Sequence, residues 1–514
     1  MHLDRESCYR ALLARDPRFD GQFFTAVRTT GIYCRPICPA RPPKLEHVIF
    51  MPSAAAAQAA GFRPCLRCRP ETSPETAAWR GTYNTVSRAL ALIAAGALNE
   101  NVVEELAGRL GVGARQLRRL FQKHLGASPK AVAGTRRVLF AKRLITDTAL
   151  PMADVALAAG FGSVRRFNDT FLKLYGRPPS GLRHAGKEAA QSSVRLTLPF
   201  KPPYDWSSLI FFLAARAIPG VERVSADAYA RSITLGEMKG TILVRPALER
   251  NCLIATIRFP AITALPLIVE RIRRLFDLGA EPGLIGAHLS SDPGMAARVR
   301  ARPGLRVPGA WDGFELGVRA ILGQQISVGA ATALAGRLVV AYGDALPPPE
   351  DASLTGLTHA FPPPRRIAEA PDLAATLGMP RARAASLIAL AEAAATDPHL
   401  FEPGKGLEAS IARLRALPGI GAWTAQYIAM RALREPDAFP ASDLGLLRAA
   451  SEPDGQPTPV RLLARAQAWR PWRAYAALHL WASDPVAARR KQEETRGFLA
   501  RTHGLADRDD SARL

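Results

Sequence analysis

Cysteine is scarce in this chain, with six residues among 514. A disulfide framework needs many paired cysteines, so metal binding in a reducing compartment fits this count better. Four of the six lie in one short N-terminal stretch, at Cys34, Cys38, Cys65 and Cys68. That grouping makes the stretch the first candidate for a metal site.

Long apolar runs are also missing. No stretch is long enough to span a bilayer, and segment 1–19 alternates charged and apolar residues without the hydrophobic core of a signal peptide. We therefore expect a cytoplasmic, nucleoid-associated protein with no membrane partner. The lack of any cysteine after Cys252 excludes an iron–sulfur cluster from the C-terminal half.

Acidic residues are too few to balance the basic ones. Lys and Arg number 68 against 45 Asp and Glu, which leaves a net charge of +23 and a pI near 10.5. Such a surplus indicates a polyanionic partner, and nucleic acid is the first candidate. The alternative is that the positive charges only form a solvated surface. The length of 514 residues suggests about three to four domains.

The cysteines themselves read C-x₃-C, then 26 residues, then C-x₂-C. Two short chelating loops of this kind predict one tetrahedral Zn²⁺ per chain, bound by four thiolates. Two interpretations stay open, an inert structural site and a site with one reactive thiolate. The second draws support from an unusual density of arginines nearby: Arg28, Arg35, Arg41, Arg63, Arg67 and Arg69.

Residues 80–186 are helical by pattern and contain an internal duplication. A short helix at 102–112 and a basic amphipathic helix at 114–125 are followed by a second pair at 152–161 and 163–175. A glycine-containing turn joins the two helices of each pair, which is the helix-turn-helix arrangement. The region resembles the DNA-binding domain of AraC-type transcription activators. The side chains expected to face DNA are Arg115, Arg118, Arg119, Arg165 and Arg166.

The sequence around the cysteines, Phe23–Arg41 followed by Gly61–Cys68, resembles the zinc domain of the Ada family over nearly all of residues 1–75. The resemblance implies that Cys34 accepts a methyl group from DNA methylphosphotriesters. Zinc keeps a thiolate ionised, and methylating one thiolate would remove a negative charge and tighten DNA binding. The Pro-Cys-His-Arg motif of the family's O6-methylguanine activity is absent. Expected contacts to the DNA backbone are Arg28, Arg35, Arg63 and Arg67.

In the C-terminal half, Leu417–Gly421 reads Leu-Pro-Gly-Ile-Gly between two helical segments. Gly419 and Gly421 let a hairpin backbone approach a phosphate closely, with a monovalent cation as a further clamp. A Pro-containing loop further on delivers Asp443. These features resemble the helix-hairpin-helix base-excision glycosylases. Motifs at 202–206, 319–324, 423–427 and 471–481 narrow the resemblance to the AlkA type, 3-methyladenine DNA glycosylase II, over about residues 195–490.

The residue types suggest a mechanism. A carboxylate at Asp443 would stabilise positive charge on the deoxyribose while water attacks, although a helix N-cap is the alternative role. Trp423 occupies the place of the lysine found in bifunctional relatives, so hydrolysis without strand cleavage is expected. Gln325 stands where an apolar residue wedges into the base stack in the best-known members.

Aromatic residues complete the expected base pocket. An electron-rich pocket could hold a flipped cationic base by stacking and cation–π attraction, while simple core packing is the alternative. The expected members are Trp423, Tyr427 and Trp481, with Tyr204 and Trp206 lining the same cleft.

The expected fold is multidomain α+β. It comprises a small zinc-binding α/β domain (1–75), an all-α tandem helix-turn-helix domain (80–186), an α+β AlkA-type N-terminal domain (195–305) and an all-α helix-hairpin-helix glycosylase domain (306–495). Residues 496–514 are expected to form a disordered tail, and residues 71–75 a linker.

Together these resemblances predict an alkylation-damage response protein. It would accept methyl groups from phosphotriesters, activate transcription and excise alkylated bases of the 3-methyladenine type. Its expected partners are double-stranded DNA, both alkylated and promoter, and RNA polymerase, and a monomer is expected. The alternative is a transcription regulator with a purely structural zinc site and an inactive glycosylase-like DNA clamp.

Overall fold

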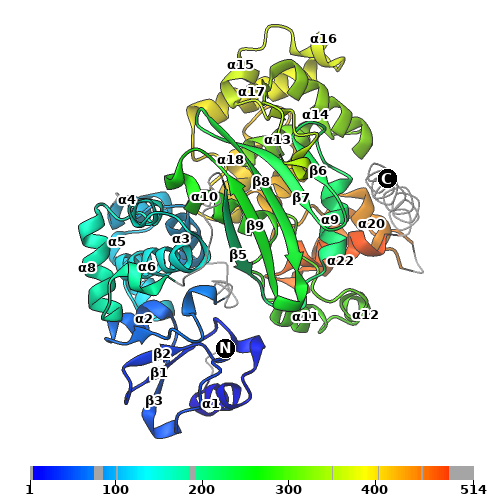
Figure 1. Ribbon diagram of the computed structural model, residues 1–514. Helices are drawn as coiled ribbons and strands as arrows, with labels where there is room; N and C mark the ends of the chain where they lie inside the picture. The colour runs from blue at the N-terminus through cyan, green and yellow to red at the C-terminus, as the bar shows by residue number, and fades with distance from the viewer. Residues whose placement is uncertain are drawn as a thin grey trace, which may run out of the picture.

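The computed structural model describes residues 4–73, 85–99, 102–183, 193–349, 351–402, 404–452 and 455–484. Figure 1 shows the N-terminal sheet at one end, a helical domain beside it, and a larger body in which a sheet packs against the C-terminal helices. The tail expected at 496–514 lies outside the described residues. None of the described helices is long and apolar enough to cross a membrane.

The N-terminal region is a four-stranded sheet with strand order β3-β1-β2-β4. Strands β2 and β4 run parallel, and Tyr33 pairs with Pro64. Cys34 and Cys65, the next residues along the chain, therefore lie side by side at the carboxyl ends of these two strands. The bounds are α1 Arg5–Leu13, β1 Phe24–Val27, β2 Ile32–Cys34, β3 Val48–Met51, α2 Ala54–Ala59 and β4 Arg63–Pro64, with 3-10 turns η1 Pro17–Phe19, η2 Leu45–His47 and η3 Pro70–Thr72.

Within the described residues, six α-helices form the next domain, and the two predicted helix-turn-helix pairs are confirmed. In each pair the second helix ends at a glycine in the left-handed conformation, Gly126 at φ 65° and Gly176 at φ 69°, where a side chain would be strained. The 19-residue helix α6, which joins the two pairs, was not singled out by the sequence pattern. The bounds are α3 Thr85–Ala94, α4 Val103–Arg109, α5 Ala114–Leu125, α6 Pro129–Asp147, α7 Met152–Ala158 and α8 Val164–Tyr175, with η4 Pro179–Leu182.

The prediction of a linker at 71–75 is wrong at its start. Glu71 is buried, and its carboxylate lies 2.8 Å from Nζ of Lys142 on α6. Arg143 donates a hydrogen bond to the Glu71 carbonyl, and Arg69 donates to Thr146 and Asp147 on the same helix. A polar sequence is therefore buried here because α6 supplies matching charges.

The third region is a five-stranded antiparallel sheet in the order β5-β9-β8-β7-β6, and the strand predicted at 194–198 is confirmed. Helix α6 lies beside β5, so the helix-turn-helix domain packs directly on this sheet (Figure 1). The bounds are β5 Val194–Pro199, α9 Trp206–Ala214, β6 Glu222–Val224, β7 Tyr229–Leu235, β8 Met238–Ala247, β9 Cys252–Arg258, α10 Leu265–Leu275, α11 Pro282–Leu289 and α12 Pro293–Ala301, with η5 Leu248–Arg250 and η6 Ile262–Ala264.

The C-terminal region is mostly helical, around a core that includes Leu338, Leu387, Ile428 and Trp469. A two-stranded ladder, β10 Asp344–Ala345 with β11 His359–Ala360, departs from the all-α expectation. The helices are α13 Gly313–Leu322, α14 Val328–Tyr342, α15 Pro364–Ala368, α16 Leu373–Leu377, α17 Arg381–Thr396, α18 Leu407–Arg415, α19 Ala422–Arg431, α20 Leu444–Ala449, α21 Pro459–Arg465 and α22 Arg473–Ser483, with η7 Ala352–Leu354 and η8 Ala466–Trp469.

Candidate functional sites

Asp443 is held by two indole rings at the start of α20. Trp423 Nε1 donates to Oδ2 at 2.9 Å, and Trp481 Nε1 donates to Oδ1 at 2.8 Å. The two tryptophans come from α19 and α22, so three helices must pack correctly before the carboxylate is held. Since both donors are uncharged, they orient the carboxylate without neutralising it.

The N-cap role of Asp443 is present as well. Its Oδ1 accepts the backbone N–H of Leu446 at 3.0 Å, which satisfies one of the free donors at the start of α20. The capping bond and the indole bonds coexist because a carboxylate has about four acceptor positions. The two roles that the sequence left as alternatives are therefore compatible.

A cavity of about 460 Å³ opens beside this carboxylate. Asp443, Trp423, Tyr427 and Trp481 all line it, so the structure brings these four predicted residues together. The Trp423 and Tyr427 rings stack, with centroids 5.1 Å apart and planes 10° from parallel. Size and aromatic lining suit a planar heterocyclic ligand.

Tyr204 and Trp206 lie elsewhere. The Tyr204 hydroxyl donates to the Phe276 carbonyl at 2.6 Å, and the Trp206 indole donates to the Ala226 carbonyl at 2.8 Å. Neither residue lines the cavity, because both pack into the core beneath the five-stranded sheet. The expectation that they share the cleft is wrong. Phe212, further along α9, lines the cavity instead.

Two arginines that the sequence analysis did not single out as site residues also line the cavity. Arg431 Nη1 donates to the Tyr427 hydroxyl at 2.6 Å, and Arg216 lies over the Phe212 ring at 3.8 Å. Burial alone would raise the pKa of Tyr427, but Arg431 and Arg216 outweigh it and lower that pKa. The four-residue spacing of Trp423, Tyr427 and Arg431 was the available signal for Arg431, since it places all three on one face of a helix.

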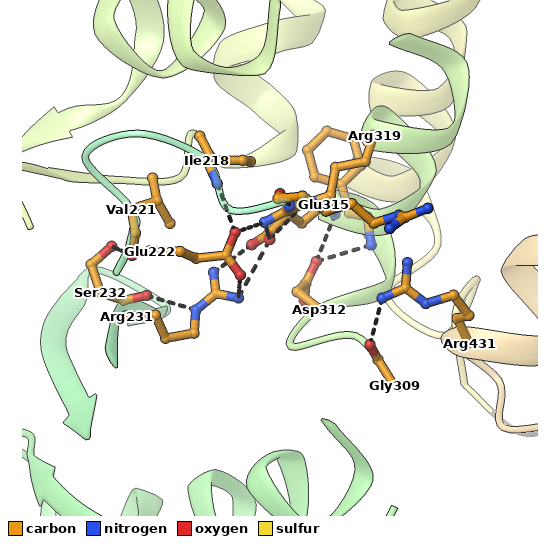
Figure 2. A network of polar contacts seen from close by, with 12 residues as sticks. Ile218, Val221, Glu222, Arg231, Ser232, Gly309, Asp312, Glu315, Arg319 and Arg431 are labelled. Atoms are coloured by element: carbon orange, nitrogen blue, oxygen red, sulfur yellow. Dashed lines mark hydrogen bonds and ion pairs between the residues drawn. The ribbon is translucent and has the colours of Figure 1, made fainter. Parts of the chain in front are cut away.

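A buried ion cluster forms one wall of the cavity, where β6 and β7 meet α13 (Figure 2). Arg231 pairs with Glu315 at 2.6 Å, and Arg319 pairs with both Glu315 and Glu222. Burial would raise the pKa of Glu315, but Arg231 and Arg319 outweigh it and lower the pKa to about 2. Arg319 also donates to the Arg216 carbonyl at 2.6 Å, which fixes the end of the α9 region that carries Phe212.

The glycine hairpin joins α18 to α19 close to the cavity. Gly419 has φ 76°, and a Cβ at this position would lie 2.0 Å from Ser386 Oγ, so only glycine fits. Gly421 is the residue before the first turn of α19.

The loop between α13 and α14, which carries Gln324 and Gln325, is tied to the hairpin. Gln324 Nε2 donates to the Gly419 carbonyl at 2.9 Å and to Thr424 at 3.2 Å. Its neighbour Gln325 is exposed and adopts a left-handed conformation, φ 59°. The loop thus presents Gln325 to solvent while Gln324 anchors the loop.

The four N-terminal cysteines converge, with all four Sγ atoms within 4.8 Å of one another. A tetrahedron of thiolates around Zn²⁺, with Zn–S near 2.3 Å, needs sulfurs about 3.8 Å apart, so the cluster fits the metal. Cys38, Cys65 and Cys68 are buried, whereas Cys34 is partly exposed. Cys34 is therefore the ligand that a second molecule could reach.

The four arginines near this cluster that were expected to contact the DNA backbone divide into two groups. Arg28, Arg63 and Arg67 are exposed. Arg35 is instead turned inward, because its guanidinium pairs with Asp20 and donates to the Cys68 carbonyl at 3.1 Å. Its backbone N–H also donates to Cys68 Sγ at 3.3 Å. The structure thus places Arg35 as a support of the metal site rather than as an open contact for DNA.

The predicted arginines of the helix-turn-helix pairs all lie at the surface of α5 and α8. Arg118 forms an exposed ion pair with Glu104 at 2.5 Å, and Arg165 lies 4.0 Å from Asp169. The exposed residues are Arg115, Arg118, Arg119, Arg165 and Arg166. These side chains give α5 and α8 basic outer faces.

Family profiles match four consecutive stretches of the chain. They are described as the metal binding domain of Ada (7–71), a helix-turn-helix domain (106–185), the AlkA N-terminal domain (195–312) and the HhH-GPD superfamily base excision DNA repair protein (318–474). The fold and these matches define a helix-hairpin-helix DNA repair protein that also carries an Ada-type metal-binding domain and a helix-turn-helix domain.

Similarity over nearly the whole chain identifies the family. A Mycobacterium tuberculosis (strain ATCC 25618 / H37Rv) protein named probable bifunctional transcriptional activator/DNA repair enzyme AlkA is 44% identical over 489 residues, which are 94% of this chain and 97% of that protein. This chain belongs to that family of bifunctional transcriptional activator/DNA repair enzymes.

Two further relatives each match part of the chain. DNA-3-methyladenine glycosylase 2 of Escherichia coli (strain K12) is 38% identical over 290 residues, 56% of this chain and 97% of that protein. The bifunctional transcriptional activator/DNA repair enzyme Ada of the same organism is 36% identical over 186 residues, 35% of this chain and 50% of that protein. The chain therefore combines regions that are similar to two separate proteins in that organism.

Proposed function

We propose that this protein excises alkylated bases of the 3-methyladenine type from DNA as a monofunctional N-glycosyl hydrolase, and that Cys34 separately takes up methyl groups from DNA methylphosphotriesters. The observation that carries the first part is Asp443, held by Trp423 and Trp481 at the edge of an aromatic cavity. For the second part it is the partly exposed Cys34 among three buried cysteines.

For base excision, the damaged nucleotide leaves the helix and its base enters the cavity. The C1′–N bond breaks, its electron pair stays on the base, and positive charge develops on the deoxyribose. Asp443 stabilises that charge, water adds to C1′, and the water proton passes to solvent. No lysine follows the hairpin, where Trp423 stands, so no Schiff base forms and the strand stays intact.

For methyl uptake, Cys34 Sγ attacks the methyl carbon of the phosphotriester, and the electron pair of the O–CH₃ bond returns to the phosphate oxygen. Bound Zn²⁺ would keep the four cysteines in the thiolate form. The methylated cysteine cannot be regenerated by this chain alone, so the step is stoichiometric. The exposed Arg28, Arg63 and Arg67 are the proposed backbone contacts.

Methylation would then act as a switch. The four thiolates with Zn²⁺ carry a net negative charge, and methylation lowers its magnitude, so repulsion from the DNA backbone falls. The buried ion pair between Glu71 and Lys142 of α6 holds the metal domain against the helix-turn-helix domain, which supports joint binding of DNA by the two domains. The proposal extends to promoter DNA and RNA polymerase as partners, a monovalent cation at the Gly419 hairpin, a cytoplasmic location and a monomer.

An assay of free base release tests the glycosylase part. Wild-type protein should release free base from methylated duplex DNA, and Asp443→Asn should lose at least about a hundredfold in rate, since one developing charge loses its counter-charge. No release by either protein would favour the inactive clamp, whereas equal release by both would refute only the role given to Asp443. Because the amide oxygen of the introduced asparagine can still accept the Leu446 N–H, the helix cap is retained in this variant.

Mass spectrometry tests the methyl acceptor. Intact protein incubated with DNA bearing methylphosphotriesters should gain one methyl group, and Cys34→Ala should gain none. Cys8→Ala is the matched control, because Cys8 is buried away from the cluster. Methyl uptake that persists in Cys34→Ala would show that another residue is the acceptor.

A further inference from the structure

Five side chains form a continuous row along the cavity: Trp423, Tyr427, Arg431, Phe212 and Arg216. The first three lie on α19 at intervals of four residues, so Trp423 is one turn before Tyr427 and Arg431 one turn after it. The Arg431 guanidinium lies 5.3 Å from the Tyr427 ring centre and 4.8 Å from the Phe212 ring centre. The row thus links α19 to α9 of the sheet domain.

The charge of Arg431 is not offset by a bonded carboxylate within the part of the chain that the structure describes. It donates to the Pro308 carbonyl at 2.8 Å, the Gly309 carbonyl at 2.9 Å (Figure 2) and the Tyr427 hydroxyl. Each of these acceptors is uncharged. Arg231 and Arg319 on the neighbouring wall differ, since each is paired with a glutamate.

Among the charged side chains that line the cavity, Asp443 and Arg431 carry opposite charges. Cleavage of the C1′–N bond adds one electron pair to the base, so the charge of the base falls by one unit whether it begins cationic or neutral. A positive group facing the base stabilises that change in both cases. Before cleavage the two cases differ, because a cationic base is repelled by Arg431 and a neutral base is not.

We propose that Arg431 sets how this cavity treats cationic and neutral bases, by weakening the binding of cationic bases and by assisting the departure of bases of either kind. An uncharged purine leaves with its electron pair as an anion, which then takes a proton from solvent, while water supplies the oxygen that bonds to C1′. This inference rests on the proposed glycosylase function.

The test compares two duplexes that differ only in the lesion, one with 7-methylguanine (cationic) and one with hypoxanthine (neutral), in single-turnover kinetics with full-length protein. Arg431→Met should lower the maximal rate for both about tenfold, a change of about 1.4 kcal/mol. The half-saturating concentration should fall for 7-methylguanine and not for hypoxanthine. Arg431→Lys, which keeps the charge, should restore most of the rate.

Arg274→Met is the control for a purely structural effect. Arg274 donates to the Ala432 carbonyl at 2.8 Å, next to Arg431, but does not line the cavity. This variant should leave both lesions unaffected. If Arg431→Met moves the half-saturating concentration in the same direction for both lesions, or Arg431→Lys restores nothing, Arg431 only holds the Pro308–Gly309 turn and the inference is wrong.

The two proposals fail in different ways. Wild-type protein that releases 7-methylguanine but no hypoxanthine overturns this inference and leaves the glycosylase function standing. Wild-type protein that releases neither base overturns the glycosylase function itself, and the inference with it.

Discussion

Replacing Lys142 by methionine should loosen the metal-binding domain from α6. Lys142 Nζ lies 2.8 Å from the Glu71 carboxylate, and the two side chains are only 2% and 0% exposed. Methionine preserves the apolar stem and removes the charge. Glu71 would then remain buried without its main counter-charge, in the segment that directly follows the metal ligand Cys68.

The expected cost follows from these contacts. Removing one partner of a buried ion pair typically costs about 3–5 kcal/mol. Arg69 Nε stays 3.1 Å from the other carboxylate oxygen and offsets part of the loss, so we expect about 2–4 kcal/mol. Since about 1.4 kcal/mol is a factor of ten, the docked state should lose about 30-fold or more in population relative to the undocked state.

Hydrogen exchange in residues 68–73 measures this loss, because undocking exposes that backbone. Lys142→Met should speed exchange there, and adding Glu71→Gln should recover part of the protection, since no buried charge is then left. Arg118→Met, which breaks the exposed pair with Glu104, is the matched control and should leave the exchange rate in residues 68–73 unchanged, because solvent screens that pair. Exchange in Lys142→Met within about twofold of wild type would refute the reasoning.

Three further predictions address the glycosylase half. Trp423→Phe keeps a ring beside Tyr427 but removes the N–H that donates to Asp443. Because a hydrogen bond to a charged group is lost, base release should slow about 10- to 100-fold. An unchanged single-turnover rate would contradict this prediction. Burial raises the pKa of Glu435 from 4.5 to about 8, so the folded state favours the protonated carboxyl. The free energy of unfolding therefore decreases as the pH rises from 4.5 through 8. The Tm of Glu435→Gln should therefore exceed that of wild type at about pH 8 and approach it near pH 5, whereas a constant offset would exclude the titration of Glu435 as the cause. Gly419→Ala places a Cβ against Ser386 at positive φ, and duplex affinity in a binding titration should fall about fivefold or more; equal affinity would show that the hairpin tolerates the strain.

The candidate sites could be predicted where a role depends on residue type within a short motif. Cysteine spacing located the metal cluster, and the hairpin glycines with Asp443 located the glycosylase cavity. Tyr204 and Trp206 show the limit of this approach, since both belong to a correct motif yet pack into the core. Which face of α9 meets the cavity depends on how the sheet domain docks on the C-terminal helices, and no local pattern encodes that docking.

Arg35 and Glu71 show the same limit for charged residues. Each looked solvent-exposed in the sequence, one as a DNA contact and one in a linker. In the fold, Asp20 lies beside the first and Lys142 beside the second, from positions 15 and 71 residues away. A charge can be buried only when a distant segment supplies its partner, and the sequence does not show which segments meet.

The sequence by itself determined the order of the four regions, the two helix-turn-helix pairs, the four cysteines and the carboxylate at Asp443, because each follows from local spacing and residue chemistry. Only the tertiary structure decided that two indoles hold Asp443, that α6 binds the metal domain through Glu71, and that an unneutralised Arg431 faces the base cavity. These depend on contacts between segments far apart in the chain, where burial and long-range packing, rather than local sequence, decide which groups meet.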